Sequence, residues 1–359
     1  SAGQIDLAWT DNSTTETRFQ IERSTNGGTT FDSIDSTLAD ATTYSDVSTV
    51  VDTEYLYRVA ACNADGCSAY SGTVTATTPP IAPTGLSITA VSVSQIDLAW
   101  TDNSTTETEF EVERSTDGGA FNALTPAAAD ATTYTDGSVG EDTEYAYRVR
   151  ACNAADCSPY SSAVTDTTPP SAASAPSATP VSDTEITVGW TDNSTYETEF
   201  RIERSPAGAN NFAQVGTVGT DIVTFDDTGL DPSTSYDYRV VACNASGCAA
   251  PSGTVTGTTQ AIPAPSGLGA TVISAGQIDL AWTDNSTTET RFNIERGAVD
   301  GTAFDSLDST LAGVTTYSDL TTVEDTAYTY RVAACNAADC SPYSSAVTDT
   351  TPPSAASAP

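Results

Sequence analysis

The sequence contains no lysine and no histidine, so its 12 basic residues are all arginine. They stand against 48 acidic residues, and the formal net charge is −36. Nucleic acids and anionic membranes are bound by clustered Lys and Arg, which release counterions from phosphates, so we exclude nucleic acid as a partner. The acidity itself has three interpretations: a solvated exterior, adaptation to high salt, or a carboxylate surface that gathers divalent cations.

Conventional catalysis also lacks its residues. Without histidine and lysine, the common general bases and amine nucleophiles are missing. Paired carboxylates could serve a glycosidase, but acids that alternate along strands are explained by a solvated face. The sequence has neither a P-loop motif nor a run of 18 apolar residues. We therefore predict that the protein is not an enzyme, that it has no catalytic or cofactor-binding residues, and that this segment does not insert into a membrane.

An internal repeat is the strongest feature that is present. The block from Ile5 to Thr14 returns at 96–105 and 278–287, and in weaker form at 186–195. Each copy holds one of the four tryptophans, which lie 90 to 92 residues apart: Trp9, Trp100, Trp190 and Trp282. This period fits a small β-sandwich of about 100 residues and is too long for helical or leucine-rich repeats.

Within a repeat, the hydrophobic residues alternate with polar ones. In the second unit Ile96, Leu98 and Trp100 are in phase, which is typical of a strand with one buried face. The same alternation predicts strands near 109–113 and 144–151, with shorter ones near 121–124, 132–135 and 162–167. Asp-Asn-Ser at 102–104 and Asp-Gly-Gly at 117–119 supply turns. Nothing predicts a helix.

Several motifs together resemble bacterial or archaeal fibronectin type III domains. They are the strand tryptophan, Glu-Arg-Ser, Tyr-x-Tyr-Arg-Val and the closing Val-Thr-x-Thr-Thr-Pro, and the segment from Leu230 to Val240 matches most closely. The other three units replace its Leu-Asp-Pro turn with Val-Asp-Thr or Glu-Asp-Thr, so the resemblance does not predict the geometry of the corner before their tyrosines. The resemblance implies an all-β tandem array of four immunoglobulin-like sandwiches of two sheets each, the first lacking its opening strand. It implies no single activity.

Proline-rich junctions predict the domain boundaries, because proline lacks a ladder donor and favours extended chain. The expected domains are 1–79 (incomplete at its start), 80–169, 170–260 and 261–352, followed by 353–359 as the start of a further repeat or a linker. The junctions are short, so we expect restricted motion between domains.

Eight cysteines form four pairs with the same spacing: Cys62 and Cys67, Cys152 and Cys157, Cys243 and Cys248, Cys335 and Cys340. Each pair brackets a loop after the Tyr-x-Tyr-Arg-Val strand, and a hairpin there brings the two within disulfide reach. Zinc is the alternative, but it needs about four converging Cys or His ligands. We predict four disulfides and hence an extracellular or cell-surface location.

Two polar motifs have more than one interpretation. Asn-x-Ser/Thr acceptor patterns for glycosylation occur at Asn12, Asn103, Asn193, Asn285 and Asn244, where the same residues also serve as turn formers. Asp11, Asn12 and Glu16 could bind calcium through oxygen ligands, but they lack EF-hand spacing, and an Asx turn is the alternative. We assign no metal ligand and no cofactor, and calcium stays open.

Two predictions concern side-chain positions. First, opposite charges should pair across neighbouring strands on their outward faces: Glu22 with Arg58, Glu113 with Arg148, Glu203 with Arg239, and Glu295 with Arg331. Second, the four tryptophans should lie in the core, because each is in phase with aliphatic residues, rather than form a sugar-stacking platform.

For function, a structural stalk, fibre, filament or sheath element at the cell surface is the first hypothesis. The alternatives are a spacer of a secreted polysaccharide-degrading enzyme and an adhesin that binds a ligand through its loops. The near identity of Ser1–Phe19 and Ser274–Phe292 favours a demand for length over varied loops. Expected partners are other copies or adjoining repeats, and cell-surface glycans or proteins for an adhesin.

The two ends of the sequence both fall inside a repeat. Unit one lacks the counterpart of Ala264–Ile273, and the tail Pro352–Pro359 reproduces Pro169–Pro176. We expect a window on a longer array, with donation of the tail as a strand beside Gln4–Trp9 of another copy as the alternative.

Overall fold

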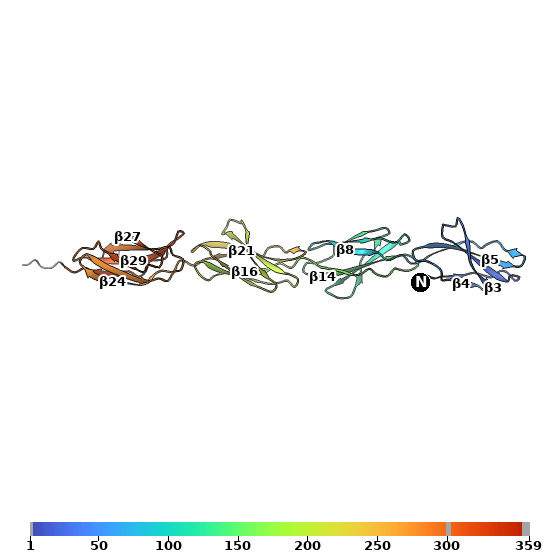
Figure 1. The fold of residues 1–359 in the computed structure, drawn as a ribbon, viewed down its shortest axis with the longest axis horizontal. Coiled ribbons are helices and arrows are strands. Elements are labelled where there is room, and N and C mark those ends of the chain that lie inside the picture. Colours follow the sequence, from blue (N-terminus) through green and yellow to red (C-terminus); the bar gives the residue numbers. More distant parts are fainter. Residues whose placement is uncertain (1–2, 299–302, 354–359) are drawn as a thin grey trace, which may run out of the picture. The chain divides into compact units, whose positions relative to one another are not determined.

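The computed structural model describes residues 3–298 and 303–353, and every regular element in them is a β-strand (Figure 1). The chain forms two compact units. One comprises Ser1–Ser171, Ser194–Thr198 and Cys243–Ala249, and the other comprises Ala172–Asn193, Glu199–Ala242 and Ala250–Pro359. The expected strand donation by the tail concerns residues that lie mostly outside the described part of the chain. Among the described residues, no helix is long and apolar enough to cross a membrane.

The second repeat shows how one sandwich is built. Its smaller sheet has the order β13 (Thr133–Asp136), β9 (Ile96–Thr101), β8 (Thr84–Val91). Its larger sheet has the order β11 (Asn122–Ala123), β10 (Glu109–Thr116), β14 (Glu144–Cys152), β15 (Val164–Thr167), and β12 (Ala127–Ala128) also pairs with β10. The alternating residues Ile96, Leu98 and Trp100 face Phe110, Val112 and other apolar residues of the larger sheet in one buried cluster.

The other repeats follow the same plan. In the first, β1 (Ile5–Ala8) pairs with β4 (Thr43–Asp46), and the larger sheet runs β3 (Asp32–Leu38), β2 (Arg18–Ser24), β5 (Glu54–Asn63), β6 (Gly66–Cys67), with β7 (Val74–Thr77) on β5. In the third, the smaller sheet has the order β16 (Ser174–Pro180), β17 (Glu185–Thr191), β20 (Thr224–Thr228). Its larger sheet has the order β19 (Ala213–Gly219), β18 (Glu199–Pro206), β21 (Ser235–Asn244), β22 (Gly247–Cys248), and β23 (Val255–Thr258) also pairs with β21. In the fourth, the smaller sheet has the order β24 (Ser266–Ser274), β25 (Gln277–Thr283), β28 (Thr316–Asp319). Its larger sheet has the order β27 (Phe304–Leu311), β26 (Arg291–Ala298), β29 (Ala327–Cys335), β30 (Val347–Thr350). Among the described residues, the smaller sheet of the first sandwich therefore has two strands where the others have three.

A buried aspartate joins the two sheets of every sandwich. In the second, Asp136 on β13 accepts hydrogen bonds from Arg114 Nη1 on β10 (2.7 Å) and from the Tyr147 hydroxyl on β14 (2.9 Å). The other sandwiches repeat the arrangement, and the four aspartates are at most 5 % exposed: Arg23, Asp46 and Tyr57; Arg204, Asp227 and Tyr238; Arg296, Asp319 and Tyr330. Because a buried charge is costly unless it is paired and hydrogen-bonded, each carboxylate fixes the stacking of one sheet on the other.

The predicted Glu–Arg pairs are confirmed in all four sandwiches. The closest N–O distances are 2.6 Å for Arg58–Glu22, Arg148–Glu113 and Arg331–Glu295, and 2.5 Å for Arg239–Glu203. Aromatic rings cover these arginines: the Arg58 guanidinium lies 4.1 Å from the ring centres of both Phe31 and Tyr70. The cation–π contacts add to the ion pair and hold its arginine in place.

The tyrosine corner forms in all four units, including the three that lack the Leu-Asp-Pro turn. Backbone N–H groups donate to the tyrosine hydroxyls at 2.8 to 3.2 Å: Val50 to Tyr55, Gly140 to Tyr145, Asp231 to Tyr236 and Val323 to Tyr328. In the replaced turns, Asp52, Asp142 and Asp325 adopt left-handed φ angles of 57°, 52° and 53°. Aspartate tolerates this region better than most residues, so proline is not required.

The tryptophan prediction holds for three rings and partly for the fourth. Trp100, Trp190 and Trp282 are 5 to 7 % exposed and pack against Phe110, Phe200 and Phe292. Trp9 packs on Phe19 in the same way, with ring centres 5.5 Å apart, but it is only half-buried. Three of the four indoles are therefore closed to a stacked sugar.

Replacing Asp136 with Asn should destabilise the second sandwich by about 2–3 kcal/mol, because Arg114 and Tyr147 lose their shared carboxylate. Native-state hydrogen exchange of the β14 amides measures this change in one sandwich of the intact chain. The same substitution at Asp97, whose carboxylate accepts hydrogen bonds from exposed Gln95 and Thr135, is the control and should change stability by less than about 0.5 kcal/mol. Equal effects at the two sites would contradict the role given to Asp136.

The buried aspartates also predict a pH dependence. Burial alone would raise the pKa of Asp46, Asp136 and Asp319, but hydrogen bonds from neighbouring Ser or Thr residues, arginine and tyrosine lower it below the ordinary value. A pKa that is lower in the folded state contributes stability that is complete above the unfolded pKa of about 3.9 and is lost as the pH falls through the folded pKa. Thermal unfolding followed by circular dichroism should show the midpoint falling below about pH 4. A midpoint constant down to about pH 2 would contradict this.

Candidate functional site: an aspartate turn that holds the next sandwich

The most elaborate polar site outside the cores lies between the first and second sandwiches, within one compact unit. The turn that carries Asp52 precedes β5, and the loop Ser104–Thr106 connects β9 to β10. The Asp52 carboxylate accepts hydrogen bonds from the Ser104 hydroxyl (2.5 Å), the Thr105 amide (3.0 Å) and the Thr106 hydroxyl (2.8 Å). The Thr106 amide also donates to it (3.2 Å). One side chain of the first sandwich therefore binds three consecutive residues of a loop in the second.

The local backbone explains why Asp52 can reach this loop. Its left-handed conformation turns the chain at the corner, while its amide donates to Pro79 O at 2.8 Å. On the receiving side, Asp102 Oδ1 accepts from the Ser104 amide (3.0 Å), an Asx turn that presents the next donors outward. Asn103 Nδ2 donates to Ala82 O and Thr84 Oγ1, both at 3.0 Å, which ties the loop to the start of β8.

A second contact crosses the same junction. Asn153, directly after Cys152, donates from Nδ2 to Thr78 O at 2.9 Å. Thr78 is itself buried and lies at the end of the first sandwich. The first sandwich thus contributes the Asp52 carboxylate to the junction, and the second contributes the side-chain amide of Asn153.

The same unit contains a second copy of this arrangement. Asp142 accepts from the Ser194 hydroxyl (2.6 Å) and from the amides of Thr195 (3.0 Å) and Tyr196 (3.1 Å). Asn244 donates to Thr168 O at 2.9 Å, and the Tyr196 hydroxyl adds a bond to Asp117 (3.0 Å). Because the same contacts recur at the next junction, they are a repeated structural feature rather than a chance contact.

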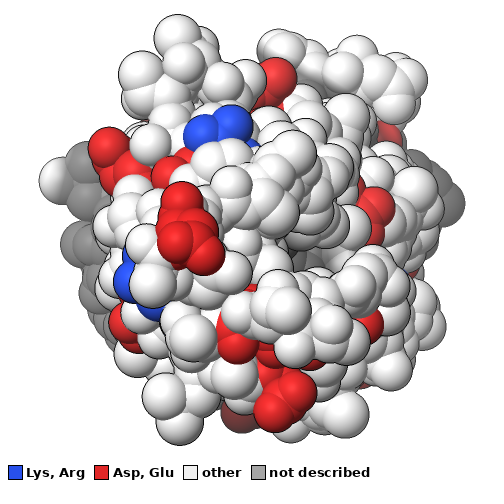
Figure 2. Space-filling view, turned by 90° about the vertical axis from the view of Figure 1, so that its right-hand side faces the viewer, with Lys and Arg blue, Asp and Glu red and all other residues white. Residues whose placement is uncertain are grey.

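The electrostatics of the first junction differ between its two aspartates. Burial alone would raise the pKa of Asp52, but the bonds from Ser104, Thr105 and Thr106 lower it below the ordinary value, so the carboxylate stays charged. Burial raises the pKa of Asp102, as do the negative charges of Glu107, Asp130 and Asp52, against the hydrogen bond from the Ser104 amide. On the face drawn in Figure 2, acidic side chains reach the surface at several separate places and arginine at fewer.

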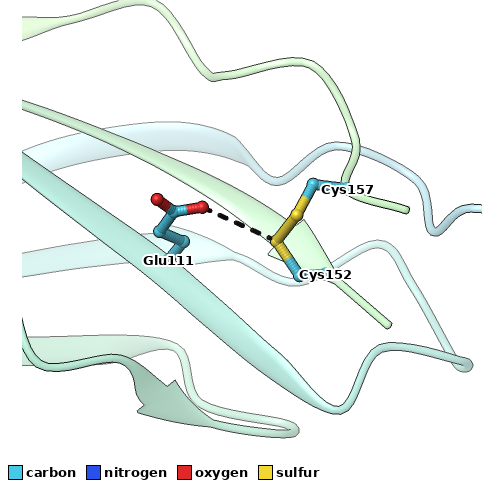
Figure 3. A group of neighbouring side chains, drawn as sticks. All are labelled: Glu111, Cys152 and Cys157. Atoms are coloured by element: carbon cyan, nitrogen blue, oxygen red, sulfur yellow. Dashed lines mark hydrogen bonds between the residues drawn. A yellow bond between two sulfur atoms is a disulfide. The ribbon is translucent and has the colours of Figure 1, made fainter. Parts of the chain in front are cut away.

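The four disulfides are present, with Cα–Cα distances of 4.0 to 4.1 Å. Figure 3 shows one of them beside Glu111, whose Oε2 lies 3.9 Å from Cys152 Sγ. A disulfide sulfur carries no proton and is not a thiolate, so these atoms are in contact without forming a hydrogen bond or a zinc site. Each disulfide closes the short loop that carries the junction asparagine or its equivalent.

The candidate glycosylation and calcium residues lie on loops, as expected. Asn12, Asn103, Asn193 and Asn285 are exposed and Asn244 is half-buried. The side-chain amides of all but Asn12 donate to backbone oxygens. Whether any is glycosylated stays a prediction. Asp11 forms the expected Asx turn, accepting from the Ser13 amide at 2.9 Å, and Glu16 lies near it together with Asp40.

Sequence reasoning did not identify Asp52 and Asp142. Their signal is the Val-Asp-Thr and Glu-Asp-Thr replacements at the corner, which depart from the domain pattern but do not by themselves indicate a contact with the next sandwich. The third sandwich keeps the Pro form and has Ser233 in the left-handed position, where no carboxylate is available. There Asp183 takes over and accepts a hydrogen bond from the Thr288 hydroxyl of the fourth sandwich.

Comparisons with known proteins agree with this fold. Residues 169–258 match the family model described as Fibronectin type III domain. The chain is 33 % identical over 309 residues to Exoglucanase B of Cellulomonas fimi, covering 77 % of this chain and 26 % of that protein. It is 27 % identical over 217 residues to mouse Usherin, covering 58 % of this chain and 4 % of that protein. The chain thus spans about a quarter or less of the length of these relatives.

Two solved structures are also similar. The FN1–FN3 domains of chicken CNTN1 share 18 % identity, cover 76 % of this chain and 99 % of their own, and give a TM-score of 0.32. A two-domain fibronectin type III segment of chicken tenascin shares 16 % identity, covers 50 % and 99 %, and gives a TM-score of 0.32. The family model matches one repeat, and the other three sandwiches share its sheet topology.

Replacing Asp52 with Ala should accelerate hydrogen exchange of the Thr105 and Thr106 amides about tenfold, because each loses a charged acceptor worth about 1.5 kcal/mol or more. Exchange measured by NMR on the intact chain tests this. Asp142→Ala is the matched control: it should accelerate Thr195 and Tyr196 and leave Thr105 unchanged. If Asp52→Ala leaves the rates of Thr105 and Thr106 unchanged, the junction is not held by this carboxylate.

Proposed function

We propose that this chain is a non-catalytic spacer segment of an extracellular protein, in which each sandwich is held to its neighbour by side chains from both partners. The observation that supports this best is the repeated carboxylate junction of Asp52 and Asp142. A loop used for ligand recognition needs accessible donors, whereas the donors of Ser104–Thr106 are used within the chain. Holding its neighbours is therefore the use that this surface serves best.

The extracellular assignment is supported by the cysteine chemistry. All eight cysteines are disulfide-bonded. Structural disulfides persist in oxidising compartments and are rare in the cytosol. The large excess of carboxylates also suits a surface exposed to variable and high ionic strength.

The similarity to Exoglucanase B supports a more specific form of this proposal. The match covers 77 % of this chain but only 26 % of that protein, as expected for a non-catalytic region shared between proteins of different activity. We therefore favour a spacer of a secreted protein that degrades polysaccharide. The sequence-based first hypothesis, a stalk or fibre at the cell surface, is the second candidate, because the same junction would serve a purely structural array.

The first sandwich carries a surface that would accept a further sandwich. Asn12, Ser13, Thr15 and Asn63, the counterparts of junction residues in the second sandwich, line a cavity of about 580 Å³ that also reaches Trp9. In the second sandwich the corresponding Asn153 is bonded to Thr78 O of its neighbour. An adjoining repeat or another copy of the chain is the partner that these donors fit, and it would also cover Trp9.

The spacer role is tested by the distance between the first two sandwiches. Spin labels on non-canonical residues at Leu38 and Val93, which are exposed, leave the disulfides intact. Pulsed electron resonance should give one narrow distance distribution, which Asp52→Ala broadens. A broad distribution in the unsubstituted protein would rule out a held junction.

The chain alone should neither release sugars from β-glucans nor bind them saturably. Saturable binding that is lost on replacing Trp9 would instead identify an adhesin.

A further inference from the structure

Three carboxylates from two segments converge in the second sandwich. Asp102 and Glu107 lie on the loop between β9 and β10, and Asp130 lies on the turn before β13. One oxygen of each lies within 4.8 Å of the others. Oxygens that coordinate one Ca²⁺ at 2.3–2.6 Å are separated by up to about 5 Å, so the spacing suits a single ion.

Glu107 contributes to this cluster a buried carboxylate oxygen that lacks a partner in the described part of the chain. Its side chain is only 7 % exposed, and Oε1 accepts from the Asp130 amide at 3.1 Å. Oε2 is shielded from solvent and has no hydrogen-bond partner among the described residues. A buried charged oxygen without a partner is destabilising, and the two neighbouring negative charges increase the cost.

The arginines of the second sandwich, all of which the structure describes, are paired elsewhere and do not neutralise this cluster. The chain has no lysine, and the second sandwich has three arginines. Arg114 is paired with Asp136, Arg148 with Glu113 and Arg150 with Glu111, at 2.7, 2.6 and 2.6 Å. The charge of the cluster must therefore be balanced from solution.

The first and fourth sandwiches provide a natural comparison. In the first, Asp11, Glu16 and Asp40 repeat the cluster, and Glu16 Oε2 is again without a partner among the described residues. In the fourth, Glu289 Oε2 is likewise without a partner among the described residues, but Gly313 replaces the turn aspartate and still donates its amide to Glu289 Oε1 (3.3 Å). All three turn residues are left-handed, with φ of 62° at Asp40, 59° at Asp130 and 68° at Gly313. Glycine therefore suffices for the turn, and the aspartates add a carboxylate that the turn does not require.

We propose that Asp102, Glu107 and Asp130 bind a calcium ion. The ligands are hard oxygens on loops, which suits the irregular coordination of Ca²⁺ better than the strict octahedron of Mg²⁺. With three carboxylates and water completing the shell, the dissociation constant falls in the range of extracellular modules, on the order of 10⁻⁴–10⁻³ M. The ion joins the β9–β10 loop to the turn before β13, and so stiffens the loop that receives Asp52. Calcium binding itself does not depend on the spacer role.

Calcium binding to the intact, chelator-treated chain tests the proposal, with equilibrium dialysis against ⁴⁵Ca²⁺ giving the number of ions bound. Asp102→Asn keeps the Oδ1 acceptor for the Ser104 amide but removes the charge, and should bind one ion fewer than the unsubstituted chain. Asp284→Asn is the matched control in the fourth sandwich, where Gly313 leaves the cluster incomplete, and should bind the same number. Circular dichroism should show that both variants remain folded.

A second variant protects the test against misfolding. Asp130→Gly introduces the residue that the fourth sandwich uses naturally, keeps the left-handed turn and its amide donor, and should also bind one ion fewer. The proposal is overturned if the unsubstituted chain binds no Ca²⁺ saturably up to about 10 mM, ten times the weakest affinity expected. It is equally overturned if Asp102→Asn and Asp284→Asn lose the same number of ions, since that describes a diffuse counterion atmosphere.

Discussion

Each sandwich depends on one buried carboxylate that belongs to the smaller sheet and is neutralised by the larger one. In the second sandwich Asp136 receives Arg114 and Tyr147 from two adjacent strands. Apolar residues alone would allow the two sheets to slide, because hydrophobic burial has no direction. A charge-assisted hydrogen bond has a fixed geometry and therefore sets the register of one sheet over the other. The positions of the corner, the disulfide loop and the junction turn follow from that register.

The sequence was sufficient to predict features that repeat with a local period. Alternation around Ile96, Leu98 and Trp100 located the strands, and the spacing of Cys152 and Cys157 located the hairpin that closes on a disulfide. The Glu113–Arg148 pair was predictable because both residues lie on strands that neighbour each other in the domain that the sequence resembles. In each case the interaction lies within one strand, one hairpin or one known pairing.

Two features could not be predicted because they join segments that no local pattern relates. Asp136 follows Arg114 by 22 residues and lies on the other sheet, and the only local sign of its role is that an aspartate recurs two residues after an aromatic residue in each repeat. Asp52 contacts a loop more than fifty residues away in the next sandwich. Its left-handed backbone, which makes the reach possible, is invisible in the sequence unless glycine occupies the position. The related cluster of the first sandwich was predicted in part: the sequence points to Asp11 and Glu16, whereas Asp40 comes from a distant turn.

The junction has a consequence for how the number of repeats in such a chain can change during evolution. A unit such as the second carries an aspartate turn, Asp142, and a receiving loop, Ser104–Thr106, so it brings one half of each of two junctions. When recombination inserts or removes a whole unit of this kind, the newly adjacent units already possess matching halves. The third unit limits this interchange, because its Ser233 cannot replace the carboxylate and Asp183 makes the contact instead. Length can therefore vary in steps of one unit without a new interface having to arise.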